Sequence, residues 1–125
     1  MLVRGFRGAT TVDANTREEI LEATAELLQG LLEANDIQHD HVASIIFTTT
    51  PDINAEFPAV AARNLGWTDV ALMCGHEMSV PGSLQRCVRI LMHVNTELAV
   101  DQVKHIYLRG ARALRPDLAA GEVRR

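Results

Sequence analysis

The 125-residue chain predicts an α+β fold, a mixed β-sheet with helices on one face, in a single domain spanning residues 1–125. Two observations predict this class. Strand patterns and amphipathic helix patterns alternate in the first half of the chain, whereas the second half carries strand patterns only. Helical crossovers followed by direct strand connections favour a mixed sheet whose helices lie on one face. The uncovered face is then available to a symmetric oligomer.

The first predicted element is a strand over residues 2–8, and it contains two arginines. Side chains alternate along a strand, so Arg4 shares a face with Phe6 while Arg7 lies on the opposite face. A guanidinium is always charged and is costly to bury without an anionic partner. Arg7 therefore needs a partner from the protein or from a ligand. We interpret Arg4 as structural, pairing at a subunit or surface contact.

A capping box opens the first predicted helix. Thr16 is placed to accept a hydrogen bond from the amide of Glu19, whose carboxylate is expected to reach back to the Thr16 amide. The helix is expected to stop at Asn35. The side chains that recur at helical spacing form one stripe, and they are Ile20, Leu21, Thr24, Leu27, Leu28, Leu31 and Leu32.

The remainder of the chain predicts a short helix and four strands. Pro58 suits the first turn of that helix, and Gly66 follows its end. Residues 75–84 have the Gly and Pro content of a loop. Pro116 ends the last strand and leaves residues 116–125 as a C-terminal tail. The helix is expected over residues 57–66, and the strands over residues 42–50, 69–74, 87–94 and 103–114.

The composition is that of an ordinary globular protein, with 47% hydrophobic and 22% charged residues. No apolar run approaches the roughly 20 residues needed to cross a bilayer, and no secretory signal pattern opens the chain. We therefore expect a cytoplasmic protein without a membrane partner. The net charge of −4 argues against a nucleic-acid partner. The two cysteines form no CxxC motif and are expected to be reduced thiols.

The distribution of arginines indicates an anion-binding site. Arg89 lies inside an apolar strand pattern, where a side chain has little freedom to reach water. Glu77 directly follows a predicted strand and either pairs with Arg89 or contacts a ligand. Tyr107 needs a partner for its hydroxyl if it is buried. A carboxylate partner or contact with water explains each arginine taken singly, whereas their recurrence suits a small polyanion; the others are Arg7, Arg63 and Arg115.

Motifs for several catalytic chemistries are missing from the sequence. There is no GxGxxG or GxxxxGK motif for nucleotides and no GxSxG motif for a serine nucleophile. The histidines follow no metal-ligand spacing, and nothing near Cys74 in the sequence identifies a base that would activate its thiol. We therefore expect no cofactor and no metal.

Four segments follow one another between residues 2 and 118: RGFRGATTV, TPDINAEFPAVAAR, CGHEM with LQRCVRILMHV, and HIYLRGARALRPDL. Together they resemble the monofunctional chorismate mutases of the trimeric, pseudo-α/β-barrel class. The resemblance implies an isomerase that rearranges chorismate to prephenate on the route to phenylalanine and tyrosine. It also implies a homotrimer with active sites in the clefts between neighbouring subunits.

The resemblance further implies roles for individual residues. Arg89 is expected to face the breaking ether bond, and Glu77 to lie near the ring hydroxyl with Cys74 as a neighbour. Arg7 is expected to bind the substrate, and Tyr107 to line the pocket. The adjacent subunit is expected to present Phe57, Ala59 and Arg63, whereas Leu114 and Arg115 help to close the cleft, and Met73 stands where the family has a threonine.

Two other functions fit the same residues. A small enamine or imine hydrolase on a similar trimer would share the anion site but would need a positioned water. A non-catalytic anion-binding protein would keep the pocket without turnover. Incubation with chorismate separates the mutase from both, because the absorbance of the conjugated diene of the substrate is lost in the rearrangement.

Overall fold

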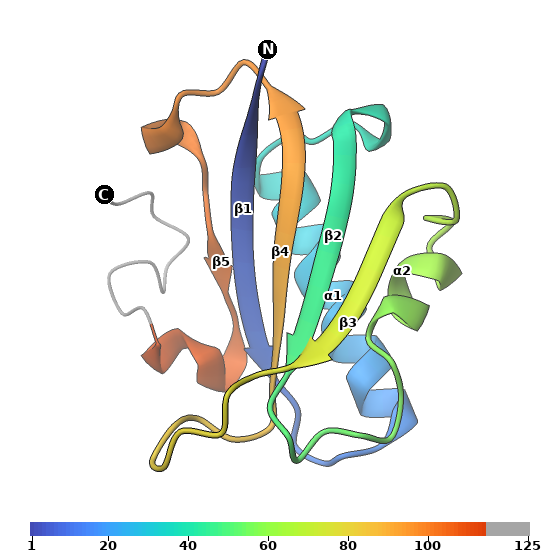
Figure 1. Cartoon of the computed structure of the whole chain (residues 1–125), viewed down its shortest axis with the longest axis vertical. Helices are drawn as coiled ribbons and strands as arrows, with labels where there is room; N and C mark the ends of the chain where they lie inside the picture. Colours follow the sequence, from blue (N-terminus) through green and yellow to red (C-terminus); the bar gives the residue numbers. More distant parts are fainter. Residues whose placement is uncertain (115–125) are drawn as a thin grey trace.

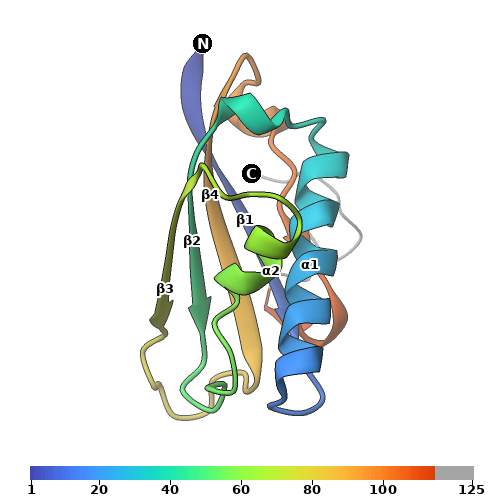
Figure 2. The same ribbon diagram turned by 90° about the vertical axis from the view of Figure 1, so that its right-hand side faces the viewer.

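The computed structural model describes residues 1–114, which form the predicted mixed sheet with both helices on one face (Figures 1 and 2). The strands are β1 Leu2–Thr11, β2 Val42–Thr49, β3 Ala71–His76, β4 Cys87–Thr96 and β5 Ile106–Tyr107, the helices are α1 Arg17–Ala34 and α2 Ala59–Asn64, and the 3₁₀ helices are η1 His39–His41, η2 Val100–Gln102 and η3 Arg109–Ala113. Except for the last strand, the element bounds differ from the predicted ones by at most three residues.

β4 lies at the centre of the sheet, in the strand order β3-β2-β4-β1-β5. It pairs antiparallel with β1 and with β2, whereas β2–β3 and β1–β5 are parallel pairs. Phe6 lies opposite Met92, and Arg7 lies opposite Leu91. Because paired residues share a face, this register sends the first pair to the helices and the second pair to the open face.

The helix-covered face holds the larger part of the core. Phe6, Phe47 and Met92 are completely buried there, in one cluster with the leucines of α1. α1 packs against β1, β4 and α2. Arg4, on this side of β1, donates from Nε to the carbonyl of Leu98 at 3.1 Å, which gives it the structural role expected, with a backbone acceptor as its partner.

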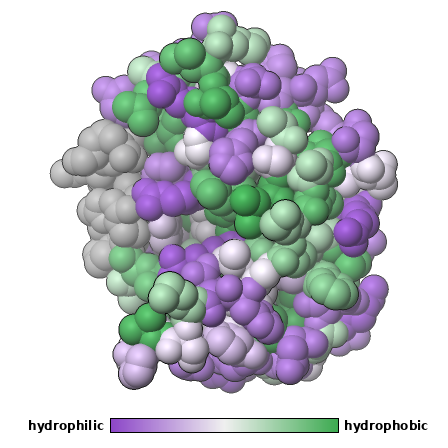
Figure 3. All heavy atoms as spheres, viewed as in Figure 1, coloured by the Kyte–Doolittle hydropathy of each residue, from purple (hydrophilic) through white to green (hydrophobic). Residues whose placement is uncertain are grey.

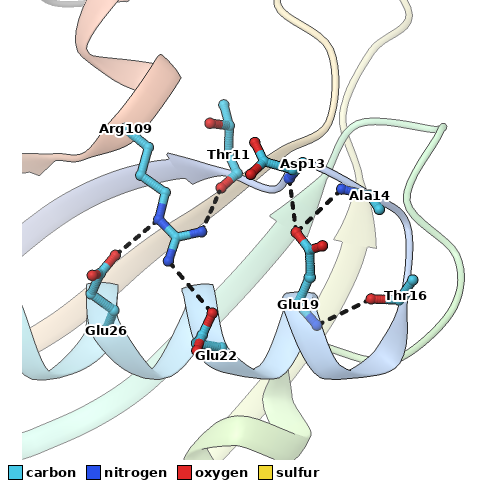
Figure 4. Close-up of polar contacts among 8 residues, drawn as sticks. All are labelled: Thr11, Asp13, Ala14, Thr16, Glu19, Glu22, Glu26 and Arg109. Carbon is cyan, nitrogen blue, oxygen red and sulfur yellow. Dashed lines mark hydrogen bonds and ion pairs between the residues drawn. The ribbon is translucent and has the colours of Figure 1, made fainter.

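The N-terminus of α1 is capped, but the predicted reciprocal bond is wrong (Figure 4). Thr16 Oγ1 accepts from the amide of Glu19 at 3.2 Å, as predicted. The Glu19 carboxylate instead accepts from the amides of Asp13 and Ala14, at 3.0 and 3.3 Å. The Thr16 amide donates to the carbonyl of Ala14 at 2.9 Å, because the chain turns tightly before the helix. The carboxylate therefore caps the preceding turn.

Of the strand predicted over residues 103–114, only Ile106 and Tyr107 form a strand, and the rest of that prediction is wrong. β5 pairs with β1 at Ile106 and Tyr107, and then Arg109 adopts a left-handed conformation with φ of 52°. Its guanidinium holds that turn, since Nε is 3.2 Å from Glu26 Oε1 on α1 and Nη1 is 3.5 Å from the carbonyl of Thr11 (Figure 4). The chain continues as η3. The predicted stop at Pro116 and the tail lie outside the described residues.

The open face of the sheet is exposed and partly apolar. Figure 3 shows this face, with hydrophobic side chains gathered over its central part. The register places Ile46, Met73 and Leu91 there, and Met73 is 66% exposed. No helix within residues 1–114 is both long and apolar enough to span a membrane.

Candidate active site

A cavity of about 220 Å³ on the open face brings together four of the predicted site residues. They come from separate segments: Arg7 from β1, Glu77 from the end of β3, Arg89 from β4 and Tyr107 from β5. The antiparallel and parallel pairings put these segments beside one another although they are far apart in sequence. The rest of the lining is Gly8, Ile46, Thr48, Ile90 and Leu91.

Arg89 lies in the middle of β4, opposite Ala9 on one side and Thr48 on the other. Its Nε atom is buried and has no hydrogen-bond partner within residues 1–114. The ion pair with Glu77 is present but long, at 3.7 Å from Nε to Oε2, beyond hydrogen-bonding distance. The Arg89 side chain is 43% exposed. An anionic ligand can therefore still be bound by this guanidinium.

Glu77 is held by the last residues of β2. Its amide donates to the carbonyl of Thr49 at 2.7 Å, which extends the β2–β3 pairing by one residue. The hydroxyl of Thr48 donates to Glu77 Oε2. Sequence reasoning missed Thr48, because a threonine in a β-branched strand carries no signal of a function.

The Arg7 side chain is available to bind a ligand, as far as residues 1–114 show. Its guanidinium has no hydrogen bond or ion pair within residues 1–114. Its backbone amide donates to Nδ1 of the buried His105 at 3.0 Å, which assigns the acceptor role to Nδ1. This bond joins β1 to the segment before β5 and so positions Arg7 beside Tyr107.

Tyr107 and Leu114 belong to a small apolar cluster at one end of the cavity. Tyr107 is buried with Ala9, Cys87 and Ala111, and Leu114 packs against them. Burial raises the pKa of the Cys87 thiol, so the thiol stays protonated. Tyr107 lines the cavity, whereas Leu114 contributes to the apolar cluster beside it.

Phe57 and Cys74 lie elsewhere, around a second cavity of about 340 Å³. Cys74 pairs in register with Phe47, so it faces the helices and lines a different cavity from the one that Glu77 lines. Met73 points to the open face, beside Ile46. Ala59 is buried at the start of α2, Arg63 is exposed on the same helix, and Arg115 lies outside the described residues.

The arrangement provides two guanidiniums and a carboxylate on a half-buried surface. Such a set can bind a small dianion through the arginines and accept a hydrogen bond from a ligand hydroxyl. Within residues 1–114 no group of three or more His, Cys, Asp or Glu side chains is placed to hold a metal ion.

Comparisons with known proteins identify the family of this chain. Residues 3–118 match the family described as chorismate mutase type I. The chain is 45% identical to chorismate mutase AroH of Bacillus subtilis, over 95% of this chain and 94% of that protein. It is 49% identical to chorismate mutase AroH of Thermus thermophilus, over 97% of this chain and all of that protein. The fold is similar to that of a chorismate mutase from Clostridium thermocellum, with a TM-score of 0.87, 52% identity and coverage of 88% of this chain and 98% of the other.

Proposed function

The chain belongs to the chorismate mutase type I family and is an isomerase, and from this premise we propose that it converts chorismate to prephenate at the open-face cavity. The observation that carries this proposal is the buried Nε of Arg89, which lacks a hydrogen-bond partner within residues 1–114. We place the reaction in aromatic amino-acid biosynthesis, and the cytoplasmic location stays a prediction from the sequence.

The rearrangement is one concerted step in which an ether C–O bond breaks while a C–C bond forms. It requires no nucleophile. Negative charge collects on the ether oxygen as that bond stretches, and we assign Arg89 to this oxygen. A guanidinium held in place beforehand stabilises the stretched, polarised state more than the ground state, and that difference lowers the barrier.

The other residues of the cavity hold the substrate in its reactive shape. We assign Arg7 to a substrate carboxylate, because its guanidinium is available and lies in the same cavity as Arg89. Binding in a folded, chair-like conformer removes part of the entropic cost of the reaction. We assign Glu77 to the ring hydroxyl, as the acceptor of a hydrogen bond, and Tyr107 to the wall of the pocket.

We propose a homotrimer in which a neighbouring subunit completes each site with the segment that carries Phe57, Ala59 and Arg63. Two observations support this assembly: Phe57 is 65% exposed although it is apolar, and the open face carries the exposed Met73. Light scattering on the purified protein is expected to give three times the chain mass of 13.7 kDa. A monomeric mass together with full activity would contradict the shared site.

The direct test is incubation with chorismate while the absorbance of its diene is followed. We expect loss of absorbance with formation of prephenate, identified by NMR. An anion-binding protein without activity would bind a bicyclic transition-state mimic and leave chorismate unchanged. A hydrolase would yield products into which water has been incorporated. The NMR spectrum distinguishes such products from an isomer of chorismate.

A further inference from the structure

We propose that Thr48 is a positioning residue for Glu77, one that keeps the carboxylate directed at the substrate and away from Arg89. The inference rests on the proposed function and adds a member to its machinery. It comes from the juxtaposition of three side chains, Thr48, Glu77 and Arg89, on the open face of the sheet.

Thr48 occupies the position between the other two. It lies on β2, the strand between β3 and β4. Gly75, two residues before Glu77, is its partner on β3, and Arg89 is its partner on β4. Paired residues of neighbouring strands project to the same face, so Thr48 shares the open face with Arg89, and its hydroxyl contacts the same Glu77 oxygen that faces the guanidinium.

Glu77 is held twice by neighbouring residues of β2. The carbonyl of Thr49 accepts from the Glu77 amide at 2.7 Å, which fixes the backbone. The Thr48 hydroxyl donates to Oε2, which fixes the side chain. Oε1 has no partner within residues 1–114 and remains available to a ligand hydroxyl.

The same hydroxyl keeps Glu77 and Arg89 from pairing tightly. Oε2 is 3.7 Å from the Arg89 Nε, whereas a charge-assisted hydrogen bond between these groups has a length of about 2.7–2.9 Å. Removing the hydroxyl leaves Oε2 without its neutral donor. The carboxylate is then expected to close onto Nε, so that each charged group satisfies the other and both are withdrawn from the substrate.

The test compares Thr48→Val, which keeps the shape and loses the hydroxyl, with Thr48→Ser, which keeps the hydroxyl. We expect Thr48→Val to lower kcat/KM about tenfold or more, mainly through kcat, since hydrogen bonds to charged groups contribute on that scale. Thr48→Ser is expected to stay within about twofold of the parent protein. Both variants should keep the parent melting temperature.

Ser44→Ala is the matched control. Ser44 lies on the same strand and face, and its hydroxyl contacts His93 Nδ1 at 3.0 Å, away from Glu77. We expect this variant to keep kcat/KM within about twofold, which would show that loss of a hydroxyl from this face of β2 is not itself harmful.

A double-mutant cycle with Glu77→Ala tests whether Thr48 acts through the carboxylate. The readout is the affinity for the bicyclic transition-state mimic, measured by calorimetry. Thr48→Val is expected to weaken binding in the parent protein and to change it less than about twofold in the Glu77→Ala background. Equal losses in both backgrounds, or a Thr48→Ser variant as impaired as Thr48→Val, would overturn the proposal.

Failure of the positioning role of Thr48 can be distinguished from failure of the proposed function. A parent protein without chorismate turnover contradicts the function, yet the binding cycle still tests the positioning role. A parent protein with turnover and a Thr48→Val variant of equal kcat/KM contradict the positioning role alone.

Discussion

The two faces of the sheet are built for different purposes. On the helix-covered face, Phe6, Phe47 and Met92 are completely buried. On the open face, Arg89 is 43% exposed, its Nε has no hydrogen-bond partner within residues 1–114, and the Glu77 carboxylate is 3.7 Å from it. The alternation of side chains along the same strands produces both surfaces.

The difference shows how one sheet separates stability from function. Burial of apolar area supplies most of the folding free energy, so the helix-covered face stabilises the chain. Charged groups left partly unpaired cost stability, and they persist where a ligand pairs with them. Mutations on the two faces should therefore have separable effects.

The largest effect is expected from the helix-covered face. Leu28 is completely buried on α1, and Leu28→Ala is expected to lower the free energy of unfolding by about 2–5 kcal/mol, through lost burial and a cavity. Urea denaturation measures this change. The activity per folded molecule should stay near that of the parent protein, and a large drop in it would break the separation between the faces.

Arg89→Lys is expected to produce the opposite result. The point charge of lysine does not reproduce the guanidinium fork, so kcat should fall about 10²–10³-fold, the cost typical of removing one preorganised donor. The unfolding transition should change little. Steady-state kinetics and a melting curve on the same sample measure both quantities, and near-normal turnover would count against the role of Arg89.

A smaller effect is expected at the cap of α1. Thr16→Ala removes the acceptor for the Glu19 amide and should lower the free energy of unfolding by about 1 kcal/mol. Thr16→Ser, which keeps the hydroxyl, is the control. If Thr16→Ala lost activity without losing stability, the helices would affect the active site directly, and the two faces would not be separable.

The smallest effect concerns a pH-dependent contact near α2. A hydrogen bond from His39, at 2.8 Å, lowers the pKa of Asp69, and His39 also stacks on Trp67. Because the pKa is lowered in the folded state, the contact stabilises the protein above the ordinary carboxyl value of 3.8, and this contribution is lost as the pH falls through the lowered pKa.

Melting temperatures of the parent and Asp69→Asn proteins, compared from about pH 6 down to about pH 2, measure that contribution. We expect a small difference that disappears at the acidic end, since Asp69 is exposed to solvent. A difference that grows on acidification would have the wrong sign for this contact.

Local patterns predicted the elements whose stabilising contacts are local. The cap at Thr16 and the periodic apolar side chains of α1 are both readable within a few residues. The strand predicted over residues 103–114 failed because the left-handed turn at Arg109 is held by Glu26 and Thr11, which are remote in sequence. No sequence pattern within residues 103–114 indicates that Glu26 and Thr11 are the partners of Arg109.

The charged residues of the candidate site could be predicted from the sequence, but their arrangement in space could not. Arg89 could be identified because a guanidinium contradicts an apolar strand pattern. Thr48 could not, since its partner lies 29 positions away. The face of Cys74 had a readable signal: Leu72 and Cys74 are two residues apart on β3 and share the helix-covered side.

The pairing of β1 with β4 sets Phe6 and Arg7 on opposite sides of the sheet. A slip of one residue in β1 would exchange these sides, driving a guanidinium into the interior and a phenyl ring into the solvent. Correct assembly and competence for catalysis thus depend on a single alignment. When this enzyme is refolded, the recovered activity should therefore be proportional to the fraction of chains in which β1 and β4 pair in the native register. Compact chains with a shifted register should be inactive.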